Sequence, residues 1–168
     1  MIANSSVTVQ STYPGFNLLG TSNKSILVNN IVKNISNGKP AVSVASECTV
    51  SSYGHNIWSV LGGTGTVDNT HNDPSTDVAA SASWSWVDPN LVVTTLPDAF
   101  YKAGTVDKRA TVSDVEAAID AFDTANSTAF KEWLTSVDAN ALMVDVTGYT
   151  RANNKDTDKI TPGSYQIR

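Results

Sequence analysis

Apolar and polar residues alternate one by one along the first third of the chain, which is the period of a half-buried β-strand. Val7 and Val9 flank Thr8, and the same alternation covers 42–44 and 49–51. Ile26 and Val28 are likewise two residues apart. Breaks rich in Gly, Pro and Asn separate these short segments. They fall at 13–15, 37–40 and 62–65. Because no helical pattern intervenes, a parallel sheet with helical crossovers is not expected here.

Two amphipathic stretches in the last third predict α-helices. Ser113 and Glu116 have the spacing of a capping box, and the apolar residues that follow it share one helical face. A second helix is expected to start near Asn126 or Ser127. Its apolar residues are Phe130, Trp133, Leu134 and Val137. Both faces are interpreted as packing faces, which lie against a sheet or cap the open end of stacked strands.

Composition narrows the class of protein. Ser, Thr and Asn make up 53 of the 168 residues, 40% are hydrophobic and only 16% are charged, with a formal net charge of −5. A chain without a basic balance is not expected to bind nucleic acid, and no apolar run of about 18 residues predicts a membrane span. We expect one domain over 1–168, with β-coils and a loop over about 1–95 and a helical cap and tail over about 96–168.

Charge is unevenly distributed along the chain. Residues 1–66 carry a net charge of +2, and residues 67–168 carry −7. The acidic stretch from Asp68 to Asp77 reads as a surface loop without the spacing of an EF-hand, so cation binding there is left open. His55 and His71 are sixteen residues apart, which is weak evidence for zinc. We expect no metal and no cofactor.

Candidate catalytic groups are scarce. Cys48 is the single cysteine, and we interpret it as a small half-buried strand residue rather than a nucleophile. Glu47 is the one acid in the predicted coils, whereas glycoside hydrolysis needs two carboxyl groups. We therefore expect no catalytic residue. Trp84 and Trp86 alternate with serine, so they either cover the core together or stack on a sugar ring as a binding pair.

A weak internal repeat suggests stacked coils. The pattern of 15–18, Gly-Phe-Asn-Leu, returns at 54–57 as Gly-His-Asn-Ile. Repeats of this kind indicate units laid on one another, and asparagines at their corners tolerate left-handed backbone. The corner residues expected on this basis are Asn17, Asn29, Asn30, Asn34 and Asn56.

Several short motifs occur in a shared order: Asn-Asn-Ile at 29–31, Ser-Tyr-Gly-His-Asn-Ile at 52–57, an Asp-Pro segment at 87–91, Asp145-x-x-Gly-x-x-Arg151, and a tail ending in Tyr165. Together they resemble the C-terminal region of bacterial surface proteins with a right-handed parallel β-helix, the pectate-lyase-like fold. The resemblance implies a mainly β fold: a short right-handed parallel β-helix of three to four coils, with a C-terminal cap containing two α-helices. It also implies structural roles, with Asp145 and Arg151 fixing the tail by an ion pair and Tyr165 packing over the final coil.

The expected function is a non-catalytic cell-surface or secreted module that binds carbohydrate or adheres. Its expected partner is a polysaccharide or another cell-envelope component, and its expected state is a monomer or weak oligomer. Two alternatives stay open: a fragment of a polysaccharide lyase or glycoside hydrolase, and a phage or intracellular structural protein. An extracellular or cell-envelope location is expected, with a signal peptide absent from these residues and either removed or upstream.

Overall fold

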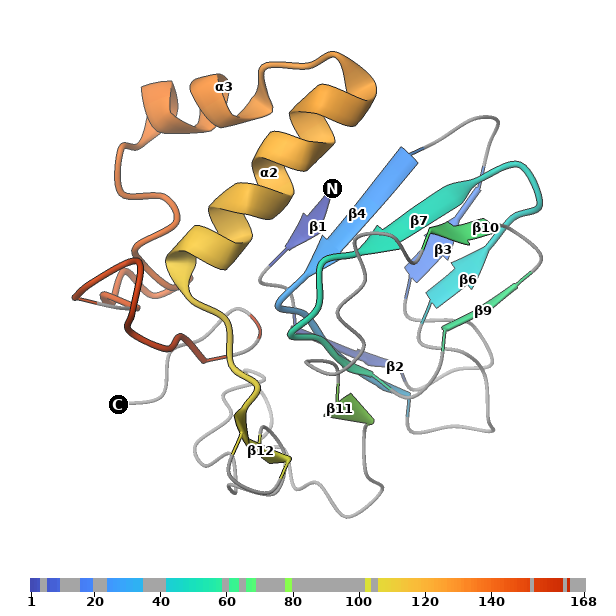
Figure 1. The fold of residues 1–168 in the computed structure, drawn as a ribbon, viewed down its shortest axis with the longest axis horizontal. Coiled ribbons are helices and arrows are strands. Elements are labelled where there is room, and N and C mark those ends of the chain that lie inside the picture. The colour runs from blue at the N-terminus through green and yellow to red at the C-terminus, as the bar shows by residue number, and fades with distance from the viewer. Residues whose placement is uncertain are drawn as a thin grey trace.

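The computed structural model describes residues 1–3, 6–9, 16–19, 24–34, 42–58, 61–63, 66–68, 78–79, 102–103, 106–151, 153–161 and 163. These residues form short β-strands followed by two α-helices (Figure 1). The strands are β1 (Ile2–Ala3), β2 (Ser6–Val9), β3 (Phe16–Leu18), β4 (Lys24–Val28), β5 (Ile31–Asn34), β6 (Val42–Val44), β7 (Thr49–Ser52), β8 (Ile57–Trp58), β9 (Leu61–Gly63), β10 (Thr66–Asp68), β11 (Val78–Ala79), β12 (Lys102–Ala103) and β13 (Val106–Asp107). The helices are α2 (Val112–Asn126) and α3 (Phe130–Val137).

The strands from β1 to β11 are divided among three parallel sheets. Their orders are β1-β4-β7-β10, β11-β8-β5-β2 and β3-β6-β9. Strands that follow one another in the chain lie in different sheets, and each pairs in parallel with the strand three places away. Among the residues described between β1 and β11, none belongs to a helix. β12 and β13 form a separate antiparallel pair.

This arrangement corrects the predicted fold class. The described residues form separate sheets of two to four strands, each strand being two to five residues long. In this described part of the chain, no sheet closes on itself or continues as a solenoid, so the right-handed β-helix of three to four coils is not retained. The alternation of Val and Ile determines which side chains of a strand face inward, but it does not determine how successive strands curve and join.

The first hydrophobic core lies between β4, β6 and β7. It contains Leu27, Val42, Val44, Cys48 and Val50, which are at most 2% exposed. β4 departs from simple alternation because both of its faces are covered. Leu27 enters this first core, whereas Ile26 and Val28 point to the opposite side, under α2. A strand buried on both faces loses the polar half of its pattern.

The second core joins the outer face of β4 to α2 and the C-terminal segment. Its buried members are Ile26, Val28, Ala110, Val112, Val115, Ala118, Ile119 and Ile160. α2 lies along β4 in Figure 1, with α3 beyond it. The apolar face predicted for the first helix is therefore confirmed as a packing face, and it covers a sheet face rather than an open end.

The predicted cap of α2 is two residues out of place. Thr111 is the N-cap, and its hydroxyl accepts a hydrogen bond from the Asp114 amide while the Asp114 carboxylate accepts one from the Thr111 amide. Ser113 lies inside the helix and donates its amide to the carbonyl of Lys155 and its hydroxyl to Asp156. The sequence holds two overlapping Ser/Thr-x-x-acid patterns, and the earlier one forms the capping box.

The predicted repeat is also corrected. Phe16–Leu18 is β3, whereas Ile57–Trp58 is β8 in another sheet. The equivalent segments are 29–31 and 55–57, because Ile31 and Ile57 are partners in parallel register. Asn29 and His55, each two residues earlier, both have left-handed backbone with φ of 52° and 61°. The sequence did not reveal this pair of turns, because the residue with left-handed backbone is Asn29 in one turn and His55 in the other.

Asparagines link these two turns, as expected for three of the five corner residues. The Asn56 side-chain oxygen accepts hydrogen bonds from both the amide and the side-chain nitrogen of Asn30, each at 3.0 Å. Asn29 supplies the left-handed backbone. Asn17 instead lies exposed in β3, and Asn34 ends β5. Those two positions are strand residues.

Candidate functional site

A groove lies between α2 and the outer face of β4 and β7. Its volume is about 490 Å³, within the usual size range of small-ligand sites. The residues that line it are Lys24, Ser25, Ile26, Thr49, Ser51, Tyr53, Asp120, Ala121, Thr124 and Ala125. It is the best candidate for a ligand site among the described residues.

The groove exists because the outer faces of β4 and β7 differ. Register pairs Ile26 of β4 with Ser51 of β7. Ile26 is apolar and attracts α2, whereas Thr49 and Ser51 are polar and gain little from being covered by a helix. α2 therefore packs over β4 and leaves the neighbouring face of β7 open.

Hydroxyl groups and small residues determine the chemistry of the lining. Thr49, Ser51 and Thr124 contribute hydroxyl groups, which both donate and accept hydrogen bonds. Tyr53 contributes an aromatic ring with a polar tip. On the α2 side the alanines at 121 and 125 keep the groove open, because their side chains end at Cβ.

Each of the two charged lining residues contacts another part of the protein. The Lys24 ammonium donates to the carbonyl of Ala125 at 3.4 Å. The Asp120 carboxylate forms an ion pair of 2.8 Å with Lys131 of α3. Among the described residues that line the groove, Asp120 carries the one carboxyl group, whereas hydrolysis of a glycosidic bond uses a pair of acids.

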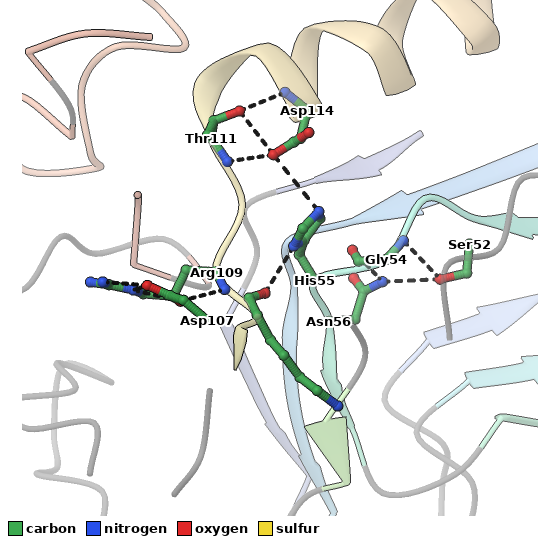
Figure 2. A network of polar contacts seen from close by, with 9 residues as sticks. Ser52, Gly54, His55, Asn56, Asp107, Arg109, Thr111 and Asp114 are labelled. Carbon is green, nitrogen blue, oxygen red and sulfur yellow. Dashed lines mark hydrogen bonds and ion pairs between the residues drawn. The ribbon is translucent and has the colours of Figure 1, made fainter. Parts of the chain in front are cut away.

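His55 belongs to a separate polar network (Figure 2). Its Nδ1 lies 2.8 Å from the Lys108 carbonyl, which only accepts, so Nδ1 is the donor. Its Nε2 lies 3.8 Å from the carboxylate of Asp114, the same group that completes the cap of α2. His55 therefore connects the turn before β8 to the start of α2.

Ser52, three residues before His55, lies in the same close-up view. Its hydroxyl oxygen accepts hydrogen bonds from the Gly54 amide and the Asn56 side chain, both at 3.2 Å. Figure 2 shows these two contacts on the side of the turn away from Asp114. This geometry is that of a hydrogen-bonded turn rather than a serine activated by a histidine.

Cys48 and Glu47 are neighbours in the chain, but one side chain is buried and the other is exposed. Cys48 is 1% exposed in the first core, so it is more deeply buried than the half-buried position predicted. Glu47 is exposed in the turn that precedes it. The interpretation of Cys48 as a packing residue is consistent with this position.

The Asp145-x-x-Gly148-x-x-Arg151 motif forms a compact turn. One oxygen of Asp145 accepts hydrogen bonds from the Thr147 amide and hydroxyl and from the Tyr149 amide, at 2.7–3.0 Å. Gly148 adopts φ of 84°, and an antiparallel bridge joins Val144 to Thr150. These contacts hold both ends of the motif in a fixed geometry.

Arg151 connects that turn to the C-terminal segment. It is 5% exposed and donates to the Val144 carbonyl at 3.0 Å and the Thr161 carbonyl at 3.5 Å. Burial lowers the pKa of Arg151, and the negative charge of Asp145 opposes that shift. The hydrogen bonds of Arg151 give it a structural role in fixing the C-terminal segment. The ion pair between Asp145 and Arg151 stays a prediction.

The remaining predicted residues lie outside the described ranges. These are Trp84, Trp86, His71, Tyr165 and the acidic stretch that follows Asp68 at the end of β10. Among the residues whose positions are described, no group of three or more His, Cys, Asp or Glu is placed to hold a metal ion. Within the same ranges, no helix is both long and apolar enough to cross a membrane.

Sequence analysis missed the groove, although a signal was present. Thr49 and Ser51 were interpreted only as polar positions of an alternating strand. The contrast between the apolar outer residues of β4 and the hydroxyl-bearing ones of β7 could have indicated where a covering helix stops. Comparison of the chain with protein-family models, with curated proteins and with solved structures finds no match.

Proposed function

We propose that this chain is a non-catalytic binding module of a cell-surface or secreted protein, and that the groove between α2 and the β4–β7 face holds a carbohydrate. The observation that carries this proposal is the lining itself. It combines hydroxyl groups on β7 and α2 with the ring of Tyr53 and two alanines that leave room for a ligand. Polyhydroxylated ligands need such a mixture of hydrogen-bonding and apolar contacts.

The composition supports the proposed location and partner. A chain in which nearly a third of the residues are Ser, Thr or Asn and few are charged is typical of envelope and secreted β-proteins. The partner proposed on this basis is a polysaccharide or another glycosylated component of the cell envelope. A binding role is favoured over hydrolysis because the groove contains a single carboxyl group, that of Asp120.

A glycan array tests the proposal directly. The wild-type chain should bind at least one glycan, and Ala125→Leu should abolish that binding because the larger side chain fills the groove. Ala117→Leu, the same change at an exposed position of α2 outside the lining, should leave binding intact. Absence of binding to every glycan contradicts the proposal.

Trp84→Ala with Trp86→Ala separates the groove from the other candidate surface. If this double variant alone loses glycan binding while Ala125→Leu retains it, the aromatic pair is the site and the groove is not. Circular dichroism of each variant confirms that a loss of binding is not a loss of the fold.

A further inference from the structure

The charges of the groove are compensated within the protein. α2 has no basic residue in its last turn, and its C-terminal carbonyl groups carry partial negative charge. Lys24 supplies the missing cation from β4, since its ammonium donates to the Ala125 carbonyl at 3.4 Å. The Asn126 side chain donates to the Lys24 carbonyl at 3.2 Å and so holds the start of β4 against the end of the helix.

The acidic residue on the wall of the groove is compensated from α3. Asp120 and Lys131 form an ion pair with a distance of 2.8 Å between the carboxylate oxygen and the ammonium nitrogen. The Asp120 side chain is 59% exposed, so the ion pair contributes little to stability. It still places the Lys131 ammonium next to the Asp120 carboxylate and offsets its negative charge. A cation entering the groove would compete with Lys131 for the same carboxylate.

An anionic ligand meets a similar obstacle. To reach Lys24, it would approach the carbonyl end of α2, where negative charge is disfavoured, and it would lie in the same groove as Asp120. The whole chain also carries a net charge of −5, which repels anions at low salt. Both charged side chains of the lining, Lys24 and Asp120, therefore already contact a group of opposite charge or partial charge within the protein. A cationic or an anionic ligand would have to compete with those contacts.

We propose that the groove selects uncharged saccharides over acidic ones, an inference that rests on the function proposed above. The hydroxyl groups of Thr49 and Ser51 lie along the β7 side for hydrogen bonds with sugar hydroxyls. Thr124 donates its hydroxyl hydrogen to the Asp120 carbonyl at 2.9 Å, so its oxygen is an acceptor on the helix side. The apolar faces of the sugar rings contact Tyr53 and the methyl group of Ala125.

The experiment is a matched titration by calorimetry with two ligands of equal length and linkage. One is an uncharged oligosaccharide that the glycan array identifies, and the other is its counterpart with a carboxylate at C6. The uncharged ligand should bind at least about tenfold more tightly. Its affinity should change less than about twofold between about 50 and 300 mM NaCl, since binding without ion pairs is insensitive to screening.

Two variants connect that result to the groove. Ala125→Leu should weaken binding of the uncharged ligand by about tenfold or more, because it removes the volume that the sugar occupies. Ala117→Leu should match the wild type. Both variants are compared by circular dichroism and thermal unfolding, so that only correctly folded proteins are titrated.

The outcomes distinguish the inference from the function on which it rests. Tighter binding of the carboxylated ligand, weakened by salt and abolished by Ala125→Leu, overturns selectivity for uncharged sugars while supporting a carbohydrate site in the groove. Binding that Ala125→Leu leaves unchanged overturns both. Absence of binding to either ligand overturns both as well.

Discussion

The carboxylate of Asp123, near the end of α2, caps the start of α3 by accepting the amide of Phe130 at 2.8 Å. Its second oxygen accepts the amide of Lys131 at 2.9 Å. Ala129, the N-cap position of α3, has no side chain that could make these contacts. A helix of eight residues is marginal by itself, so its first turn depends on a residue of the preceding helix.

Asp123→Ala is expected to unwind α3 while leaving α2 folded. The substitution leaves the amides of Phe130 and Lys131 without their acceptor, and it places a good helix former in α2. The measurement is ellipticity at 222 nm at low temperature, together with amide exchange across residues 128–137. Asp120→Ala removes a carboxylate from the same helix without exposing these amides, and it should retain the helical signal. Equal exchange in the two variants would contradict the capping role.

Stability should fall in acid because two carboxyl groups have lowered pKa values. A hydrogen bond from the Thr128 hydroxyl, assisted by the amides of Lys131 and Phe130, lowers the pKa of Asp123. Burial by itself would raise the pKa of Asp107, but hydrogen bonds and charge from Arg109 outweigh burial and lower it. In the unfolded chain both groups return to values near 3.8.

The sign of the pH effect follows from those directions. A carboxyl group with a lowered pKa in the folded state contributes stability that is complete above its unfolded pKa and is lost as the pH falls through the folded value. The melting temperature should therefore decline below about pH 4. Asp107→Asn combined with Asp123→Asn should start from a lower melting temperature and decline less steeply. Identical slopes for the double variant and the wild type would contradict the assignment.

Asn56→Ala should be strongly destabilising. The Asn56 side chain is fully buried and joins two turns, accepting from Asn30 and donating to Ser52 and Gly54. Its removal leaves the buried amide of Asn30 unsatisfied, which costs about 1–3 kcal/mol. Urea denaturation provides the measurement. Asn17→Ala, at an exposed position of β3, should change the free energy of unfolding by less than about 0.5 kcal/mol.

The sequence indicated local features better than their assembly. The alternation at 42–44 correctly predicted inward-facing valines, and the stripe from Val115 to Phe122 correctly predicted a packing face. The capping box was displaced because Thr111 and Ser113 both begin an acceptable pattern, and only contact with Lys155 and Asp156 distinguishes them. Local pattern alone does not contain that long-range information.

The candidate site was less predictable than the strands. The groove depends on the register that sets Ile26 beside Ser51 and on where α2 crosses β4, and neither follows from the period of the sequence. The capping role of Asp123 was not predicted either, because this residue belongs to the preceding helix and lies seven residues before Phe130. The turn formed by Asp145 and Gly148 depends more on local sequence, since the Asp145 carboxylate accepts hydrogen bonds from residues two and four positions later.

A substitution at Gly148 tests the turn formed by Asp145 and Gly148 without changing any side-chain packing. The φ of Gly148 is 84°, and a Cβ added there would meet nothing within 4 Å. The cost of Gly148→Ala should therefore come from the left-handed backbone alone and amount to about 1–2 kcal/mol in the free energy of unfolding. Gly148→Asn should cost less, because asparagine tolerates this conformation. Both values come from urea denaturation of the same preparation. If Gly148→Ala is as stable as the wild type, the turn that positions Asp145 and Arg151 does not require the left-handed residue, and its rigidity has another source.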